Sequence, residues 1–201
     1  MTPADCPPPG NAEAPLRGRE LLVCVCGGIA AFKVAQVVST VVQLGCGVRV
    51  AMTRAARRFV GPVTFRALSG RPVHTSLWQE TAGDIPHLKL TEEADLLLVA
   101  PATANILGKL AGGIADDLVS SLLLGAACPV LLAPAMNARM WAHPAVARNV
   151  EFLRSSGFRF IGPDSGWQAC RADGPGRMSE AHAIVAEIQS QLAALPPRNA
   201  P

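Results

Sequence analysis

The stretch that decides the fold runs Asp95-Leu96-Leu97-Leu98-Val99-Ala100-Pro101-Ala102-Thr103-Ala104-Asn105, and the chain repeats its plan from Val130 to Trp141. Each copy is a short apolar run that ends in a proline turn, and an asparagine follows the turn: Asn105 in the first copy and Asn137 in the second. Strands that are apolar throughout are typical of parallel sheets covered on both faces, where polar ligands are met at the carboxyl ends. We therefore expect a binding site where these two strands end.

Outside this pair, apolar stretches of strand length alternate with stretches of helical periodicity. Such alternation predicts a parallel sheet with crossover helices. The expected fold class is α/β, a single doubly wound domain of flavodoxin or Rossmann type, with a mostly parallel sheet and helices on both faces. We expect further strands at 20–26, 48–52, 73–77 and 158–161, and helices that begin near Pro62, Pro144 and Ser179, the last capped by Ser179.

The 201 residues suit one folded domain between two tails. Residues 1–18 are rich in proline, glycine and small polar residues, so we expect them to be disordered. The folded domain is expected over 19–195, and 196–201 form the second tail. Within the domain, 163–178 carry too many glycines and prolines for regular structure, which predicts an irregular, mobile flap over a site.

The composition argues against several classes of function. Charged residues make up 16% of the chain and the net charge is +3, so we expect no nucleic-acid surface. The densest basic group, Arg54, Arg57 and Arg58, fits a solvated helix face better, although these arginines could also contact a phosphate. The six cysteines are irregularly spaced, which predicts neither a disulfide scaffold nor a metal site. No apolar stretch is long and unbroken enough to span a membrane, and we expect a cytoplasmic protein.

The turn Gly27-Gly28-Ile29-Ala30-Ala31-Phe32-Lys33 joins the first strand to a helix. Its small residues let a ligand approach the backbone, and the helix start favours an anion. It is not the dinucleotide fingerprint, because G-x-G-x-x-G is absent and Thr53 stands where a dehydrogenase would have an acidic residue. The Thr53 hydroxyl can cap the next helix or contact a phosphate. His87 is a lone histidine, for which spacing alone favours a structural role.

Five segments in this order resemble the flavin-dependent cysteine decarboxylases. This family contains phosphopantothenoylcysteine decarboxylase and the peptide decarboxylases of lantibiotic maturation. The resemblance covers about residues 21–188, and several motifs together are more specific than any one of them. Its segments are the turn 27–33, His87, Pro101-Ala102-Thr103-Ala104-Asn105, Pro134-Ala135-Met136-Asn137 with Met140-Trp141, and the flap that carries Cys170.

The resemblance implies a carboxy-lyase that binds FMN and assembles as a homotrimer or as a dodecamer of trimers. It implies that His87 is the catalytic base and that Cys170 is a late proton donor. It also implies that Asn137 binds the substrate carboxylate, with Met140 and Ala169 beside the substrate. The residues expected to hold FMN are Gly28, Ile29, Thr53, Thr103, Ala104 and Asn105, with Ala135 against the edge of the flavin.

Cysteine decarboxylation needs an oxidation, because direct loss of CO₂ would leave a carbanion with nowhere to delocalise. If a base takes the thiol proton and the β-carbon passes hydride to the flavin, the resulting thioaldehyde accepts the electrons that CO₂ loss releases. The product is an enethiolate. Forming phosphopantetheine then requires a reduction and a proton, for which a flap cysteine is suited. Cys170 therefore favours phosphopantothenoylcysteine as the substrate.

Three alternatives stay open. The chain leaves no room for the synthetase to which the bacterial coenzyme A enzyme is often fused, which favours a peptide ending in cysteine as the substrate. Glu92 and Glu93 also stand where many relatives are basic, which weakens phosphate binding at that segment. A flavin prenyltransferase and a non-catalytic regulatory subunit are more remote, because neither explains His87, Asn137 and Cys170 together.

Overall fold

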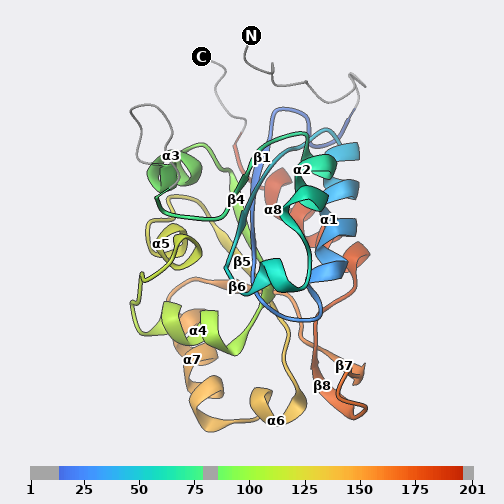
Figure 1. The fold of residues 1–201 in the computed structure, drawn as a ribbon, viewed down its shortest axis with the longest axis vertical. Coiled ribbons are helices and arrows are strands. Elements are labelled where there is room, and N and C mark those ends of the chain that lie inside the picture. The colour runs from blue at the N-terminus through green and yellow to red at the C-terminus, as the bar shows by residue number, and fades with distance from the viewer. Residues whose placement is uncertain (1–13, 79–85, 197–201) are drawn as a thin grey trace.

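A single parallel sheet forms the centre of the protein. The structure is a computed structural model that describes residues 14–78 and 86–196, without the side chains of 86–88. Six strands lie in the order β3-β2-β1-β4-β5-β6, all parallel (Figure 1). This order reverses between β1 and β4, so the predicted doubly wound fold is confirmed. The strands are β1 (Glu20–Val25), β2 (Gly47–Met52), β3 (Val73–His74), β4 (Leu96–Ala102), β5 (Val130–Pro134) and β6 (Arg159–Phe160).

Helices cover both faces of this sheet (Figure 1). One apolar cluster packs α1 (Ala31–Gln43), α2 (Pro62–Ser69) and α8 (Ala181–Ala193) on one face. A second cluster packs α3 (Pro86–Glu92), α4 (Ala104–Ala111), α5 (Leu118–Leu124) and α7 (Pro144–Ser155) on the other. The short elements η1 (Ala56–Arg58) and α6 (Ala138–Trp141) follow β2 and β5. No helix in the described ranges has the length and apolar character that a membrane crossing requires.

The strands β4 and β5 are buried over their whole length, as their composition predicts. They are neighbours, and their carboxyl ends meet where Ala102 pairs with Pro134. Pro101 does not end β4. A register shift between Val99 and Ala102 accommodates the proline, which has no N–H to donate, and the strand runs one residue further.

The flap is regular, so the prediction of an irregular segment at 163–178 is wrong. It is an antiparallel hairpin of β7 (Asp164–Trp167) and β8 (Asp173–Arg177). Glycines make this possible, because Gly174 and Gly176 have φ values of 155° and 122°, which other residues rarely adopt. A Cβ on Gly176 would overlap the carbonyl oxygen of Met136, and the Met136 N–H donates to the Gly176 carbonyl over 2.9 Å. The hairpin therefore lies against the backbone that follows β5.

Two local predictions also need correction. The folded part begins before residue 19, because Leu16 is only 3% exposed and its N–H donates to the Leu44 carbonyl over 3.0 Å. Ser179 does not cap α8: Glu180 is the N-cap residue, and the Ser179 hydroxyl donates to Asp164 over 2.8 Å. The predicted tails otherwise lie in 1–13 and 197–201, outside the described residues.

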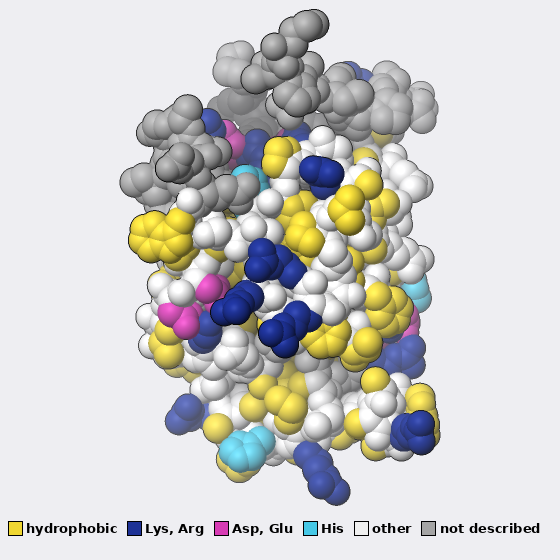
Figure 2. Space-filling model, in the orientation of Figure 1, with side chains coloured by type: hydrophobic (Ala, Val, Ile, Leu, Met, Phe, Trp, Pro, Cys, Tyr) yellow, Lys and Arg dark blue, Asp and Glu magenta, His cyan; other side chains and the backbone are white. Residues whose placement is uncertain are grey.

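Charged side chains do not form a continuous basic surface on the face drawn in Figure 2. Lys and Arg side chains there lie among apolar and uncharged atoms. Some of these charges pair with carboxylates, such as Arg71 with Glu20 and Lys109 with Asp116 and Asp117. This distribution agrees with the low charged fraction of the sequence.

Candidate functional site

A cavity of about 740 Å³ lies at the carboxyl ends of β1, β4 and β5. Its walls come from the turns that follow these three strands, at 27–33, 103–105 and 135–140, and from the hairpin at 167–170 and 176–178. This is the point where the strand order reverses, which is where doubly wound sheets bind ligands. The site expected from the two asparagine-bearing strand ends is therefore present as a cavity.

Each asparagine-bearing turn begins a helix, but only in the second turn is the asparagine itself the N-cap residue. Thr103 is the N-cap of α4, and its hydroxyl accepts from the Ile106 N–H over 3.4 Å. Asn137 is the N-cap of α6, and its Oδ1 accepts from the Met140 N–H over 2.8 Å. Oδ1 accepts the capping hydrogen bond, and the amide NH₂ of Asn137 presents two further donors for a ligand. An NH₂ group donates hydrogen bonds, as a carboxylate ligand requires.

The turn after β1 is shaped by two glycines. A Cβ on Gly27 would overlap the side chain of Ala55, so only glycine lets this turn pack against the segment after β2. A Cβ on Gly28 would lie 3.5 Å from Pro101 and 3.6 Å from Thr103, in the space between the turns after β1 and β4. Glycine at this position keeps that space open for a bound group.

The cavity brings together most of the residues predicted for the site, and among the predicted residues whose side chains are described only Thr53 is not part of its lining. The Thr53 hydroxyl instead accepts from the N–H of Ala56, the first residue of η1, over 3.1 Å. His87 belongs to α3, but its side chain lies outside the described residues. The predicted residues that line the cavity are Gly28, Ile29, Thr103, Ala104, Asn105, Ala135, Asn137, Met140, Ala169 and Cys170.

Cys170 differs from the other described cysteines because it is exposed and lines the cavity. Burial raises the pKa of Cys46 to about 12 and that of Cys128 to about 11. Burial also raises the pKa values of Cys24 and Cys26. A buried thiol of this kind is chemically inert. Among residues 14–78 and 86–196, Cys170 is therefore the cysteine that can react with a bound substrate.

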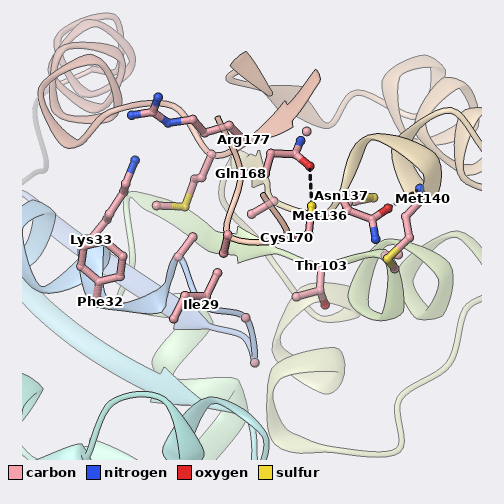
Figure 3. A pocket seen from close by; sticks show the side chains of 18 of the residues that line it. Ile29, Phe32, Lys33, Thr103, Met136, Asn137, Met140, Gln168, Cys170 and Arg177 are labelled. Atoms are coloured by element: carbon pink, nitrogen blue, oxygen red, sulfur yellow. Dashed lines mark hydrogen bonds between the residues drawn. The ribbon is translucent and has the colours of Figure 1, made fainter. Parts of the chain in front are cut away.

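Gln168 holds this cysteine and the hairpin in place, and sequence reasoning missed it. The side chain is 8% exposed. Its Oε1 accepts from the Ala138 N–H over 3.2 Å and from the Cys170 thiol over 3.5 Å (Figure 3). Its NH₂ group donates to the Pro175 carbonyl over 2.9 Å. One amide thus connects Cys170, the second hairpin strand and the helix that Asn137 begins.

We expect Gln168→Leu to loosen the hairpin without unfolding the domain. Leucine has a similar size but makes none of these hydrogen bonds, and a loss of about 1 kcal/mol or more would raise the hydrogen-exchange rate of the Met136 N–H, which bonds to the hairpin, about fivefold. The matched control is Gln191→Leu, because Gln191 is a 4% exposed glutamine on α8 away from the hairpin. An exchange rate of this N–H that is the same in both variants and in the unaltered protein would contradict this role.

A strand order of 3-2-1-4-5-6 with a cavity at the reversal defines a nucleotide-binding class of α/β protein. The family model described as Flavoprotein matches residues 9–193. The chain belongs to this flavoprotein family.

Among curated relatives, the coenzyme A biosynthesis bifunctional protein CoaBC of Bacillus subtilis is 47% identical over 179 residues, which is 89% of this chain and 44% of that protein. The protein of the same name from Escherichia coli K12 is 44% identical over 171 residues, 85% of this chain and 42% of that protein. The chain thus spans less than half the length of these bifunctional relatives.

Two solved structures share the fold over nearly their full length. The FMN-dependent cysteine decarboxylase SpaF has a TM-score of 0.77 and 36% identity, and the match covers 88% of this chain and 98% of that one. A cysteine-to-serine mutant of PPC decarboxylase, complexed with pantothenoylaminoethenethiol, has a TM-score of 0.79 and 26% identity, and the match covers 89% of this chain and 100% of that one.

Proposed function

We propose that this chain is an FMN-dependent cysteine decarboxylase whose substrate is phosphopantothenoylcysteine. The observation that carries the proposal is the single cavity that joins Asn137, Cys170 and the glycine turn after β1. The relatives support it: curated relatives at 41–47% identity carry the coenzyme A biosynthesis name, and SpaF is named as an FMN-dependent cysteine decarboxylase. The product is phosphopantetheine, and the enzyme is a carboxy-lyase.

The cavity has the features that FMN needs. The turn at Gly28 and Ile29 offers open space beside the backbone, and Thr103, Ala104 and Asn105 form the first turn of α4, whose N–H groups suit a phosphate. We assign FMN to these residues, with Ala135 at its edge. Thr53 stays a candidate ligand at the end of β2. When bound, FMN supplies the reversible two-electron acceptor that decarboxylation of a cysteine requires.

The proton transfers and the binding of the substrate are assigned to residues of the protein itself. His87 takes the thiol proton, and the Asn137 NH₂ group holds the carboxylate in line without a salt bridge that would stabilise the ground state. Met140 and Ala169 lie beside the same part of the cavity. After CO₂ has left, an enethiolate remains; forming the saturated thiol needs two electrons, which reduced FMN would return, and a proton at carbon. Cys170 delivers that proton, because its thiol is exposed within the cavity.

A peptide ending in cysteine is the alternative substrate. It is favoured by the likeness to SpaF at 36% identity, which is higher than the 26% identity to PPC decarboxylase. The presence of Cys170 favours the coenzyme A substrate, because release of an enethiol product would need no late proton donor.

We propose a homotrimer, alone or in a dodecamer of trimers, located in the cytoplasm. Beside the cavity, Ile29 and Phe32 are each 59% exposed, and Met140 is 44% exposed. Large apolar side chains around a cavity favour burial by another copy of the chain. Light scattering of the flavin-loaded protein measures the assembly.

Identifying the bound flavin tests the cofactor assignment directly. We expect the purified protein to be yellow and to release FMN, not FAD, when it is denatured.

His87→Asn should keep the flavin and lower CO₂ release by about a hundredfold or more, because a general base is removed. A colourless protein that takes up no added FMN would contradict the assignment, and unchanged CO₂ release by His87→Asn would remove the proposed base.

A further inference from the structure

The turn that carries Asn137 is bonded to the hairpin on both sides of the asparagine. Directly before it, the Met136 N–H donates to the Gly176 carbonyl of β8 over 2.9 Å. Directly after it, the Ala138 N–H donates to Oε1 of Gln168 over 3.2 Å. The hairpin therefore holds the backbone on either side of the residue proposed to bind the substrate carboxylate.

Close packing accompanies these two hydrogen bonds. A Cβ on Gly176 would lie 3.1 Å from the amide nitrogen of Gln168 and 3.3 Å from the carbonyl carbon of Asn137. A Cβ on Gly174 would lie 3.0 Å from the Cβ of Ala138. The hairpin and the start of α6 are therefore in direct van der Waals contact, and neither moves without disturbing the other.

The direction of the Asn137 amide depends on this backbone. Its Oδ1 accepts from the Met140 N–H over 2.8 Å, so the first turn of α6 sets the plane of the amide. The NH₂ group of the same amide then has a fixed direction into the cavity that Asn137 lines. Hydrogen bonds weaken steeply when their angle closes, so a shift at the start of α6 weakens a carboxylate contact made by this NH₂ group.

Gln168 is the side chain that makes this connection. It is 8% exposed, and its NH₂ group donates to the Pro175 carbonyl of β8 over 2.9 Å, so its position is fixed within the hairpin. In Figure 3, Gln168, Cys170 and Asn137 lie next to one another. The bond between Met136 and Gly176 involves backbone atoms alone, whereas the bond to Ala138 depends on the Gln168 side chain.

We propose that Gln168 is a positioning residue for the substrate carboxylate. It holds Asn137 in the orientation that binds this group, and it thereby couples carboxylate binding to the docking of the hairpin. The inference rests on the proposed function, which places the carboxylate at Asn137. Coupling is reciprocal: if the docked hairpin strengthens carboxylate binding by some factor, a bound carboxylate strengthens docking by the same factor.

Two unreactive ligands isolate the carboxylate. Phosphopantothenoylalanine keeps the carboxylate but has no thiol, and N-ethylphosphopantothenamide is the same molecule without the carboxylate. Calorimetry with flavin-loaded protein should show that the acid binds about tenfold more tightly than the ethylamide. Gln168→Leu should weaken the acid about tenfold and leave the affinity for the ethylamide within about twofold.

The matched control is Gln191→Leu, the same change at a buried glutamine of α8, which should leave both affinities unaltered. Equal losses for the two ligands of Gln168→Leu would mean that Gln168 only holds the hairpin in place, and would overturn the inference. Equal affinities for the acid and the ethylamide in the unaltered protein would overturn it as well.

A double-mutant cycle shows whether Gln168 acts through Asn137. Asn137→Ser keeps an N-cap acceptor but removes the NH₂ donors. In this background Gln168→Leu should change the affinity for the acid by less than about twofold, because the contact that Gln168 positions is already lost. A further loss of about tenfold would show that Gln168 acts elsewhere.

Hydrogen exchange measures the coupling from the other direction. A saturating concentration of the acid should slow exchange of the Met136 N–H about tenfold more than a saturating concentration of the ethylamide. Gln168→Leu should remove this difference. Equal protection by the two ligands in the unaltered protein would contradict the coupling.

These binding and exchange measurements need no turnover, which separates the inference from the proposed reaction. If no substrate releases CO₂ but the ligands and the cycle behave as expected, the proposed function fails and the positioning role stands. If CO₂ is released but Gln168→Leu weakens both ligands equally, the positioning role fails alone. A peptide ending in alanine and the corresponding ethylamide repeat the comparison for the alternative substrate.

Discussion

Replacing Asn137 with Asp is expected to slow CO₂ release by about a hundredfold or more while the domain stays folded. Aspartate is as good an N-cap as asparagine, so the bond from the Met140 N–H, 2.8 Å long, persists in the variant. The change falls on the other half of the side chain, where an NH₂ donor becomes a carboxylate oxygen. That oxygen repels the substrate carboxylate, which costs about 3 kcal/mol or more at a desolvated site.

The effect of Asn137→Asp is measured as CO₂ released from carboxyl-labelled substrate, together with flavin content and the thermal midpoint. The control is Asn149→Asp on α7, outside the cavity, where the same change in charge should leave CO₂ release unaltered. Full activity of Asn137→Asp would show that the substrate carboxylate binds elsewhere. Loss of flavin or of folding in that variant would instead assign Asn137 a structural role.

Cys170→Ser is expected to separate the two halves of the reaction. In a single turnover, CO₂ release should stay within about twofold, whereas the yield of saturated thiol should fall by about a hundredfold, the range in which a general acid contributes. The physical reason is that a serine hydroxyl is a far weaker acid than a thiol. The unsaturated enethiol should accumulate in place of phosphopantetheine.

Mass spectrometry of the products checks this separation, since the two thiols differ by two hydrogens. Cys128→Ser is the control, because Cys128 is a partly buried cysteine that does not line the cavity. An unchanged yield of saturated thiol from Cys170→Ser would remove the proposed proton donor. Loss of both CO₂ and thiol would mean that the flap cysteine acts before decarboxylation.

The sheet and the position of the site could be predicted because their signals are local. The strands β4 and β5 are wholly apolar, which only a sheet covered on both faces accommodates. Thr103 and Asn137 have capping side chains directly after those strands, and both begin helices at the cavity. Strand composition and a cap one to three residues later are enough to place a site at one edge of a parallel sheet.

The hairpin and the polar contacts around it could not be predicted because they depend on tertiary packing. In the sequence, Gly176 predicts an interruption of regular structure. In the structure, glycine is required at this position because the hairpin lies against the Met136 carbonyl. Gln168 has no sequence pattern that marks it, since its four hydrogen-bond partners come from the hairpin and from Ala138. Lys33 and Arg177 lie 144 positions apart along the chain, and both contact Glu180.

The claim that the chain decarboxylates phosphopantothenoylcysteine is tested most directly by measuring CO₂ and thiol release by the FMN-loaded protein. The same measurement is made with a short peptide ending in cysteine. The expected result is CO₂ from phosphopantothenoylcysteine with an equal amount of saturated thiol, and far slower release from the peptide. Release of CO₂ from the peptide alone, or from neither substrate, would contradict the claim.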